Sequence, residues 1–269
     1  MFKKLIAMVT LKFNQKNYAG ALEDMRKAIE LDPANAEYYF MSGNIKNNLG
    51  NYSEAIADID KALELNPGFA AAYTSRARNK GALGDYAGAL ADCARAKELL
   101  EPTNTQRMAQ LYEVTAATKG LMGDDYGALA DYTSIIKLDP SNAAAYYHRA
   151  VAKSQIKDYS GVLEDVHKAL DFIASGRLSQ LEVLDCYIII GQAEHSRGNY
   201  PAALRYYDAI IELCRGSAIP VQPNIYINRA ETKVMLGDKQ GAMEDLLLAE
   251  KLGAEDARRR IALLEAGLY

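Results

Sequence analysis

The chain has 269 residues, a net charge of −4, 25% charged residues, no Trp and three Cys. Its longest basic run is Arg258-Arg259-Arg260. Phosphate binding needs a basic stripe, so the composition argues against a nucleic-acid partner. No segment approaches the roughly 18 consecutive apolar residues of a transmembrane helix, and we expect no insertion into a membrane.

The N-terminal stretch has the outline of a targeting signal, because Met1 to Lys4 carry charge and Leu5 to Leu11 are mostly apolar. No small-residue cleavage site follows before Tyr18. The stretch therefore predicts the first helix of the folded chain in a cytoplasmic protein. Export to the periplasm is the alternative if the stretch belongs to a targeting signal. One face of the predicted helix carries Leu5, Met8, Val9 and Phe13.

A small residue that opens an apolar helix returns seven times along the chain. The steps between successive copies are 34, 34, 39, 34, 41 and 39 residues. A period of this size indicates stacked units that bury one another's apolar faces, rather than one globular core. The seven anchors are Ala21, Ala55, Ala89, Ala128, Val162, Ala203 and Ala242.

Each copy has the pattern of a helical hairpin. Between residues 36 and 67, two apolar-patterned segments flank the turn Gly50-Asn51-Tyr52, and Asn66-Pro67 ends the second. The alternation typical of strands is absent, so the predicted fold is all-α. Residues 101–107, 174–182 and 215–224 are longer connectors. We predict one domain, 1–269, made of units 2–35, 36–69, 70–103, 109–142, 143–176, 184–217 and 223–252, and closed by a capping helix at 255–267.

Four sequence positions recur in nearly every unit. In the second unit they are the aromatic Tyr39, the small Gly43, the turn glycine Gly50 and the closing Ala62. These positions resemble the signature of the tetratricopeptide repeat, in a bacterial-type array of about seven repeats that covers nearly the whole chain. The resemblance implies a right-handed superhelix, an α-solenoid of antiparallel helix-turn-helix repeats. The fourth unit departs from the pattern, with Asp125 in the position of the turn tyrosine.

Charged residues also recur with the repeat, which indicates a structural role. We predict that Asp58 lies within ion-pair reach of Lys80 or Arg76, and that Arg76 lies level with Asp92. The sixth unit has Glu194 and Tyr206 in the two charged positions and should lack the contact. The recurring lysines are Lys12, Lys46, Lys80, Lys119, Lys153 and Lys233, and the recurring aspartates are Asp24, Asp58, Asp92, Asp131, Asp165 and Asp245.

The sequence gives little support to catalysis. The three histidines are far apart, and neither a zinc-binding HExxH spacing, a Gly-rich phosphate loop nor a Gly-x-Ser-x-Gly elbow occurs. Cys93, Cys186 and Cys214 are widely spaced, which argues against a disulfide framework. We therefore expect no enzyme activity, catalytic residue, cofactor or metal.

The resemblance implies that the first helices line a concave groove that holds a partner protein or peptide. Asparagine suits this role because its side chain offers a donor and an acceptor to an extended backbone. We also expect Tyr147 and His148 to form an apolar anchor patch with Ile188 and Ile189. The implied groove residues are Phe40, Met41, Asn44, Asn47, Asn48, Arg78, Tyr147, His148, Ile188, Ile189, Gln192, His195 and Asn228.

Some members of the family bind acidic C-termini of chaperones through a carboxylate clamp. Asn44 occupies one clamp position, but Phe40, Ser75, Gln110 and Val114 occupy others, which argues against this partner. The leading prediction is a non-catalytic scaffold that binds a partner segment in the groove. The alternatives are a self-associating structural protein, which would form a homo-oligomer, and the repeat module of a larger enzyme or regulator.

Overall fold

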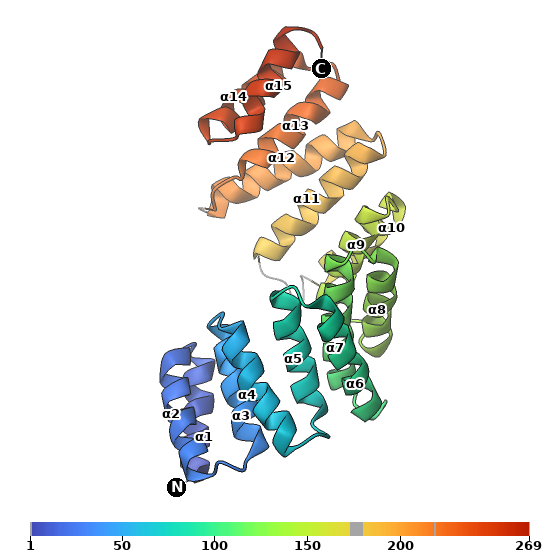
Figure 1. The fold of residues 1–269 in the computed structure, drawn as a ribbon. Helices are drawn as coiled ribbons and strands as arrows, with labels where there is room; N and C mark the ends of the chain where they lie inside the picture. The colour runs from blue at the N-terminus through green and yellow to red at the C-terminus, as the bar shows by residue number, and fades with distance from the viewer. Residues whose placement is uncertain (1, 173–179, 218, 269) are drawn as a thin grey trace. The chain divides into compact units, whose positions relative to one another are not determined.

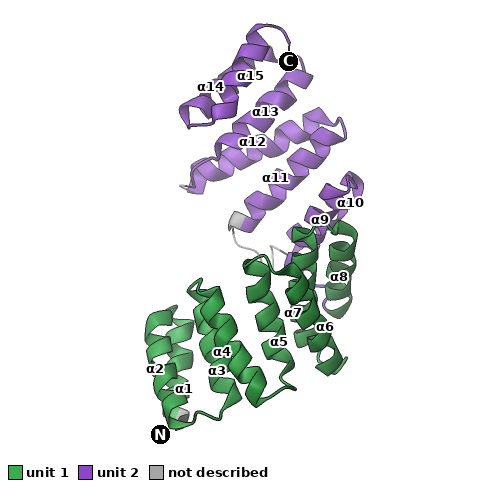
Figure 2. Ribbon diagram, in the orientation of Figure 1, with its two compact units in different colours: residues 1–138 green, residues 139–269 purple. Residues whose placement is uncertain are grey.

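The computed structural model describes residues 2–172, 180–217 and 219–268, and every regular element in these ranges is a helix. The predicted all-α solenoid is confirmed, since the helices follow one another as antiparallel pairs with a closing helix. Backbone contacts divide the chain into two compact units, unit 1 (residues 1–138) and unit 2 (residues 139–269), coloured separately in Figure 2.

Unit 1 consists of four helix pairs, coloured from blue to green in Figure 1. The two helices of each pair pack on one another, and the second helix also packs on the first helix of the next pair. Their bounds are α1 (Phe2–Asn14), α2 (Tyr18–Leu31), α3 (Ala36–Asn48), α4 (Tyr52–Leu65), α5 (Ala70–Ala82), α6 (Tyr86–Leu99), α7 (Thr105–Leu121) and α8 (Asp125–Leu138).

Unit 2 consists of three further pairs and the helix α15, which packs on α14 at the end of the array. Leu264 of α15 completes a core cluster with Ala230 and Leu246, as a capping helix should. The bounds are α9 (Ala143–Gln155), α10 (Tyr159–Asp171), α11 (Gln180–Ser196), α12 (Tyr200–Ser217), α13 (Pro223–Met235), α14 (Lys239–Lys251) and α15 (Glu255–Glu265).

Two first helices are longer than the repeat pattern predicts. Helix α7 begins at Thr105 and α11 at Gln180, whereas the corresponding predicted units begin at 109 and 184. The side chain of Asn104 caps α7 by accepting a hydrogen bond from the backbone N–H of Arg107 at 3.2 Å. Part of the predicted connector 101–107 is therefore helix. The end of the predicted fifth unit, residues 173–176, lies outside the described residues.

The hairpin turns follow one chemical pattern. The turn glycines take a left-handed conformation, with φ of +84° at Gly84, for example. Asp85 follows and caps the second helix, its carboxylate accepting from the N–H of Gly88 at 2.9 Å. The first and fifth turns have no glycine, and Lys16 and Lys157 adopt the left-handed conformation there, with φ of 58° and 61°.

The small residues of the repeat bring paired helices close together. A methyl group at Gly43 would lie 2.6 Å from Ile59 Cγ1 and 3.0 Å from the carbonyl oxygen of Ala55. A methyl group at Gly191 would lie 2.8 Å from the ring of Tyr207. All three distances are shorter than van der Waals contact, so only glycine fits these positions without displacement of a neighbour.

The apolar core is a series of clusters along the array, as the repeat predicts. The first cluster contains Val9, Met25 and Ile45, with Leu5 and Phe13 packed beside them. Helix α1 thus serves as the first helix of a repeat. Met8 is 41% exposed, and Ile6 packs against the cluster instead, so the prediction was wrong for Met8.

The recurring lysines and aspartates pair with one another inside a single hairpin. Lys80 Nζ lies 2.9 Å from Asp92, and Lys46 Nζ lies 2.8 Å from Asp58. The prediction that Asp58 reaches Lys80 or Arg76 was therefore wrong. In a hairpin both residues lie one to two helical turns from a shared short turn, and the long lysine side chain spans the difference.

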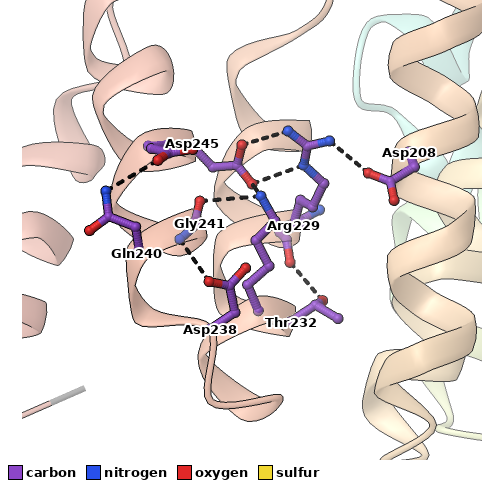
Figure 3. A network of polar contacts seen from close by, with 10 residues as sticks. Asp208, Arg229, Thr232, Asp238, Gln240, Gly241 and Asp245 are labelled. Atoms are coloured by element: carbon purple, nitrogen blue, oxygen red, sulfur yellow. Dashed lines mark hydrogen bonds and ion pairs between the residues drawn. The ribbon is translucent and has the colours of Figure 1, made fainter.

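The expected level position of Arg76 and Asp92 is confirmed, because Arg76 donates to both oxygens of this carboxylate at 2.8 and 2.6 Å. Arg76 also reaches back to Asp60 of the preceding hairpin at 2.5 Å. Figure 3 shows the same arrangement around Arg229, which joins Asp245 of its own hairpin to Asp208 of the preceding one. These arginines bridge successive repeats.

The sixth hairpin lacks the recurring pair, as predicted. Glu194 accepts a hydrogen bond from the side chain of Asn199 at 3.0 Å, and the ring of Tyr206 meets Tyr187 edge to face at 5.7 Å. Aromatic packing replaces the ion pair there. Within the described ranges, no helix combines the length and the apolar character needed to cross a bilayer.

Candidate partner-binding groove

The first helices of successive pairs gather on one face of each unit. In unit 1, α3 contacts α5 and α5 contacts α7, although a second helix separates each of these pairs in sequence. In unit 2, α11 contacts α9 and α13 in the same way. This is the face to which the sequence assigns the partner-binding residues.

Unit 1 carries a hollow of about 480 Å³ on this face, which we call the unit 1 groove. Of the predicted site residues, it brings together Phe40, Asn44, Asn47, Asn48 and Arg78. Its lining, contributed by α3, α5, α7 and adjoining residues, is Phe13, Phe40, Asn44, Asn47, Asn48, Ala71, Thr74, Ser75, Arg78, Leu100, Asn104, Gln106, Arg107 and Gln110.

One predicted site residue of unit 1 is absent from the groove lining, and nine of the fourteen lining residues are not among the predicted site residues. Met41 packs against the core cluster of α1 and α2 instead. Asn104, Gln106 and Arg107 were missed because the sequence pattern placed the start of their helix at 109. Asn104, a residue type that caps the start of helices, was the signal that could have found them.

The groove asparagines form a network between α3 and α5. Asn47 Nδ2 donates to Asn79 Oδ1 at 2.9 Å, and Ser75 Oγ donates to Asn44 Oδ1 at 2.9 Å. Asn48 Nδ2 donates to the carbonyl oxygen of Asn44 at 2.8 Å. The described residues provide no partner for Asn44 Nδ2, Asn47 Oδ1 or Asn48 Oδ1. One donor group and two acceptors therefore remain for a ligand.

The lining charge of the groove is positive, although the whole chain is acidic. Arg78 and Arg107 are both exposed, and neither forms an ion pair within the described residues. The fourteen lining residues include no Asp or Glu. Glu113 shares a neighbouring hollow of about 130 Å³ with Arg78.

Unit 2 has a second hollow, of about 310 Å³, that brings together the predicted Gln192, His195 and Asn228. His195 Nδ1 lies 2.9 Å from Thr232 Oγ1, and this hydroxyl donates to the carbonyl oxygen of Asn228 at 2.8 Å. Because the hydroxyl has a single proton, Nδ1 must be the donor to it, and Nε2 of the neutral ring is an acceptor. Glu231 also lines this hollow and pairs with Arg260 of the capping helix.

The expected apolar anchor patch is not assembled as one surface. Tyr147 and Ile189 pack against the core cluster around Val162, whereas Ile188 packs against the cluster around Ile225. Burial raises the pKa of Tyr147 to about 12. His148 is exposed and meets the Tyr147 ring edge to face at 5.2 Å. Ile188 and Ile189, neighbouring positions of one first helix, thus pack against two different core clusters.

Thiol chemistry is disfavoured in the folded protein. Cys93, Cys186 and Cys214 are free, as predicted, and all three are buried; burial raises the pKa of Cys186 to about 12. Among the described residues, no three His, Cys, Asp or Glu side chains gather as a metal site requires.

The chemistry that the unit 1 groove offers is hydrogen bonding and positive charge.

Models of the tetratricopeptide repeat match residues 6–35 and 36–69 of the chain. Tetratricopeptide repeat protein 36 of Danio rerio is 38% identical over 79 residues, which are 29% of this chain and 40% of that protein. The matched region therefore spans less than half the length of this curated relative.

Three solved structures share the fold at low sequence identity. A tetratricopeptide repeat protein from Parabacteroides merdae is 17% identical, with 98% of both chains covered and a TM-score of 0.62. PilF of Pseudomonas aeruginosa is 14% identical, with 87% and 96% covered and a TM-score of 0.67. YrrB, described as having an unusual peptide-binding site, is 18% identical, with 72% and 94% covered and a TM-score of 0.55.

Proposed function

Because the chain belongs to the tetratricopeptide repeat family, we propose that it is a non-catalytic scaffold whose unit 1 groove binds an extended segment of a partner protein. The observation that carries the proposal is the row of amide side chains along this groove. A hollow of about 480 Å³ suits a few residues of an extended chain, and its polar groups match the donors and acceptors of a peptide backbone.

The free groups of the groove asparagines have the polarity that a backbone needs. Asn44 Nδ2 can donate to a peptide carbonyl, while Asn47 Oδ1 and Asn48 Oδ1 can accept from peptide N–H groups. Their other atoms are already bonded within the protein. The side chains are therefore held in position before the ligand arrives, which lowers the entropy cost of binding.

No single one of these contacts supplies useful affinity. A neutral hydrogen bond contributes about 0.5–1.5 kcal/mol, whereas micromolar binding needs about 8 kcal/mol. Several amides must act together with apolar contacts to Phe13 and Phe40. The similarity to YrrB, described as a peptide-binding repeat protein, supports the same reading.

The test is a selection from a random library of 12-residue peptides against the full chain. Affinities of the selected peptides are then measured for the native chain and for Asn48→Ala with Gln110→Ala, which removes two exposed lining amides. Gln15→Ala in the turn after α1 is the matched control, because Gln15 is exposed and lies outside the lining.

We expect the groove variant to weaken binding by about tenfold and the control to leave it unchanged. The proposal is wrong if repeated selections enrich no peptide, or if the control weakens binding as much as the groove variant does.

A further inference from the structure

The charges around the unit 1 groove carry information about its ligand beyond the amide pattern. Elsewhere in unit 1, half-buried cations are paired: Lys46 with Asp58, Arg76 with Asp60 and Asp92, and Lys119 with Asp131. Each of these half-buried cations therefore has a carboxylate partner within the repeats. Arg78 and Arg107 differ from these cations, since both are exposed and neither has an ion-pair partner within the described residues.

The two arginines approach the same hollow from different helices. Arg78 lies on α5, one turn beyond Ser75, and Arg107 lies in the first turn of α7. Both line the groove together with Asn48 and Gln110, and no acidic side chain is part of the lining. The chain as a whole carries a net charge of −4, so this positive surface is a local departure from the average.

An arginine side chain matches a carboxylate because its planar group donates two parallel hydrogen bonds. A nucleic-acid backbone is also anionic, but binding it needs a longer basic stripe or aromatic rings for base stacking. The lining has two cations, and of its two phenylalanines Phe40 packs against Phe69 at 4.7 Å. The many amides instead suit a peptide backbone, so the observations favour a peptide over a nucleic acid.

We infer that the segment bound in the unit 1 groove is an acidic peptide, whose Asp or Glu side chains pair with Arg78 and Arg107 while its backbone bonds to the amides. This inference rests on the proposed function, since it names the chemistry of the partner at the same site. Arg78 and Arg107 lie outside the carboxylate-clamp positions named in the sequence analysis. We therefore assign the carboxylates that pair with them to Asp or Glu side chains of the peptide, and not to its C-terminus.

Glu113 provides an internal check on the inference. It shares the neighbouring hollow with Arg78, and no ion pair joins the two within the described residues. An acidic ligand on Arg78 is repelled by this carboxylate. Glu113→Gln should therefore strengthen the binding of acidic peptides and leave that of neutral peptides unchanged.

The experiment uses three pools of labelled 12-residue peptides with blocked ends. Alternate positions are apolar, and the others are Asp/Glu, Asn/Gln or Lys/Arg. Binding to the full chain is measured by fluorescence anisotropy at low and high salt, for the native protein and for Arg78→Glu, Arg107→Glu, Glu113→Gln and Asn48→Ala with Gln110→Ala. Arg26→Glu on α2 is the control, because Arg26 is exposed and lies outside the groove lining. Circular dichroism establishes that each variant is folded.

We expect the acidic pool to bind tightest and to weaken as salt rises. Each reversal in the groove should weaken its binding at least about tenfold, and Arg26→Glu should have little effect. Equal binding of the acidic and neutral pools, with loss in the amide variant, overturns the acidic partner and retains the peptide scaffold. An absence of binding by all three pools overturns both proposals. Displacement of the acidic pool by a tighter-binding oligothymidylate overturns the inference in favour of a nucleic-acid site.

Discussion

Removal of Asp245 is a severe test of the scaffold ion pairs. Its side chain is only 2% exposed, and it accepts from Arg229 at 2.8 and 2.6 Å (Figure 3). Lys233 Nζ lies 2.8 Å from the same carboxylate. Asp245→Ala would leave two half-buried cations without this carboxylate, and Asp208, which is 52% exposed, would remain as the ion-pair partner of Arg229.

Removing one partner of a buried ion pair costs about 3–5 kcal/mol, because the remaining charge stays desolvated. Asp208 retains part of the compensation for Arg229, so we expect about 3 kcal/mol for Asp245→Ala. The matched control is Asp58→Ala. Asp58 is 20% exposed and its lysine also approaches Glu54 at 3.7 Å, so the expected cost is about 1 kcal/mol.

The assay is native-state hydrogen exchange, read on peptides from α13 and α14 for Asp245→Ala and from α3 and α4 for Asp58→Ala. Local readout is needed because repeat arrays need not unfold in one step. Lys233→Met in the Asp245→Ala background should recover part of the loss, since it removes one unpaired charge. Equal losses for the two aspartate variants, or no recovery, would refute the claim that desolvated charge governs these contacts.

Three further predictions concern packing, thiols and pH. Gly43→Ala should destabilise the chain by about 1–3 kcal/mol, because the added methyl group clashes with Ile59. Gly120→Ala should stabilise α7 by up to about 1 kcal/mol, because its methyl group would meet no atom within 4 Å. Urea unfolding followed by circular dichroism compares the two variants. The three buried cysteines should react with a thiol reagent far more slowly in the native chain than in denaturant, and fast native labelling of Cys186 would contradict its burial. A hydrogen bond from Lys12 lowers the pKa of Asp24, so this pair stabilises the chain above the ordinary aspartate pKa near 3.9, and the contribution is lost as pH falls through the lowered pKa. Lys12→Met should therefore lose less unfolding free energy on acidification than the native chain does. Equal dependence of the unfolding free energy on pH in the two proteins would count against the pair.

The repeat pattern was sufficient to predict the fold because each of its positions has a local physical role. The turn glycines predict where hairpins reverse, and Gly43 predicts where paired helices approach closely. The error at Asp58 concerned distances across the stack. Sequence spacing places a residue along its own helix, but which neighbouring helix a charge reaches depends on packing angles that the pattern does not contain.

The groove was predicted only in part, for a related reason. Asn44, Asn47 and Asn48 lie at regular positions of a first helix, and the structure places them in one hollow. Arg107 was missed because α7 extends beyond the repeat, and the packing of Ile188 against a core cluster was not foreseen. Helix extensions and the division of one helix between two cores depend on three-dimensional packing, so an alignment of repeat positions cannot reveal them.

The claim that unit 1 binds a partner segment along its first helices is tested most directly by NMR. Backbone amide shifts of the labelled full chain are followed while the tightest-binding acidic peptide is added. We predict that the shifts concentrate at groove residues of α3, α5 and α7, such as Asn48, Ser75 and Arg107, and saturate at the affinity found by anisotropy. Shifts confined to the second helices α2, α4 and α6, or to unit 2, would contradict the account.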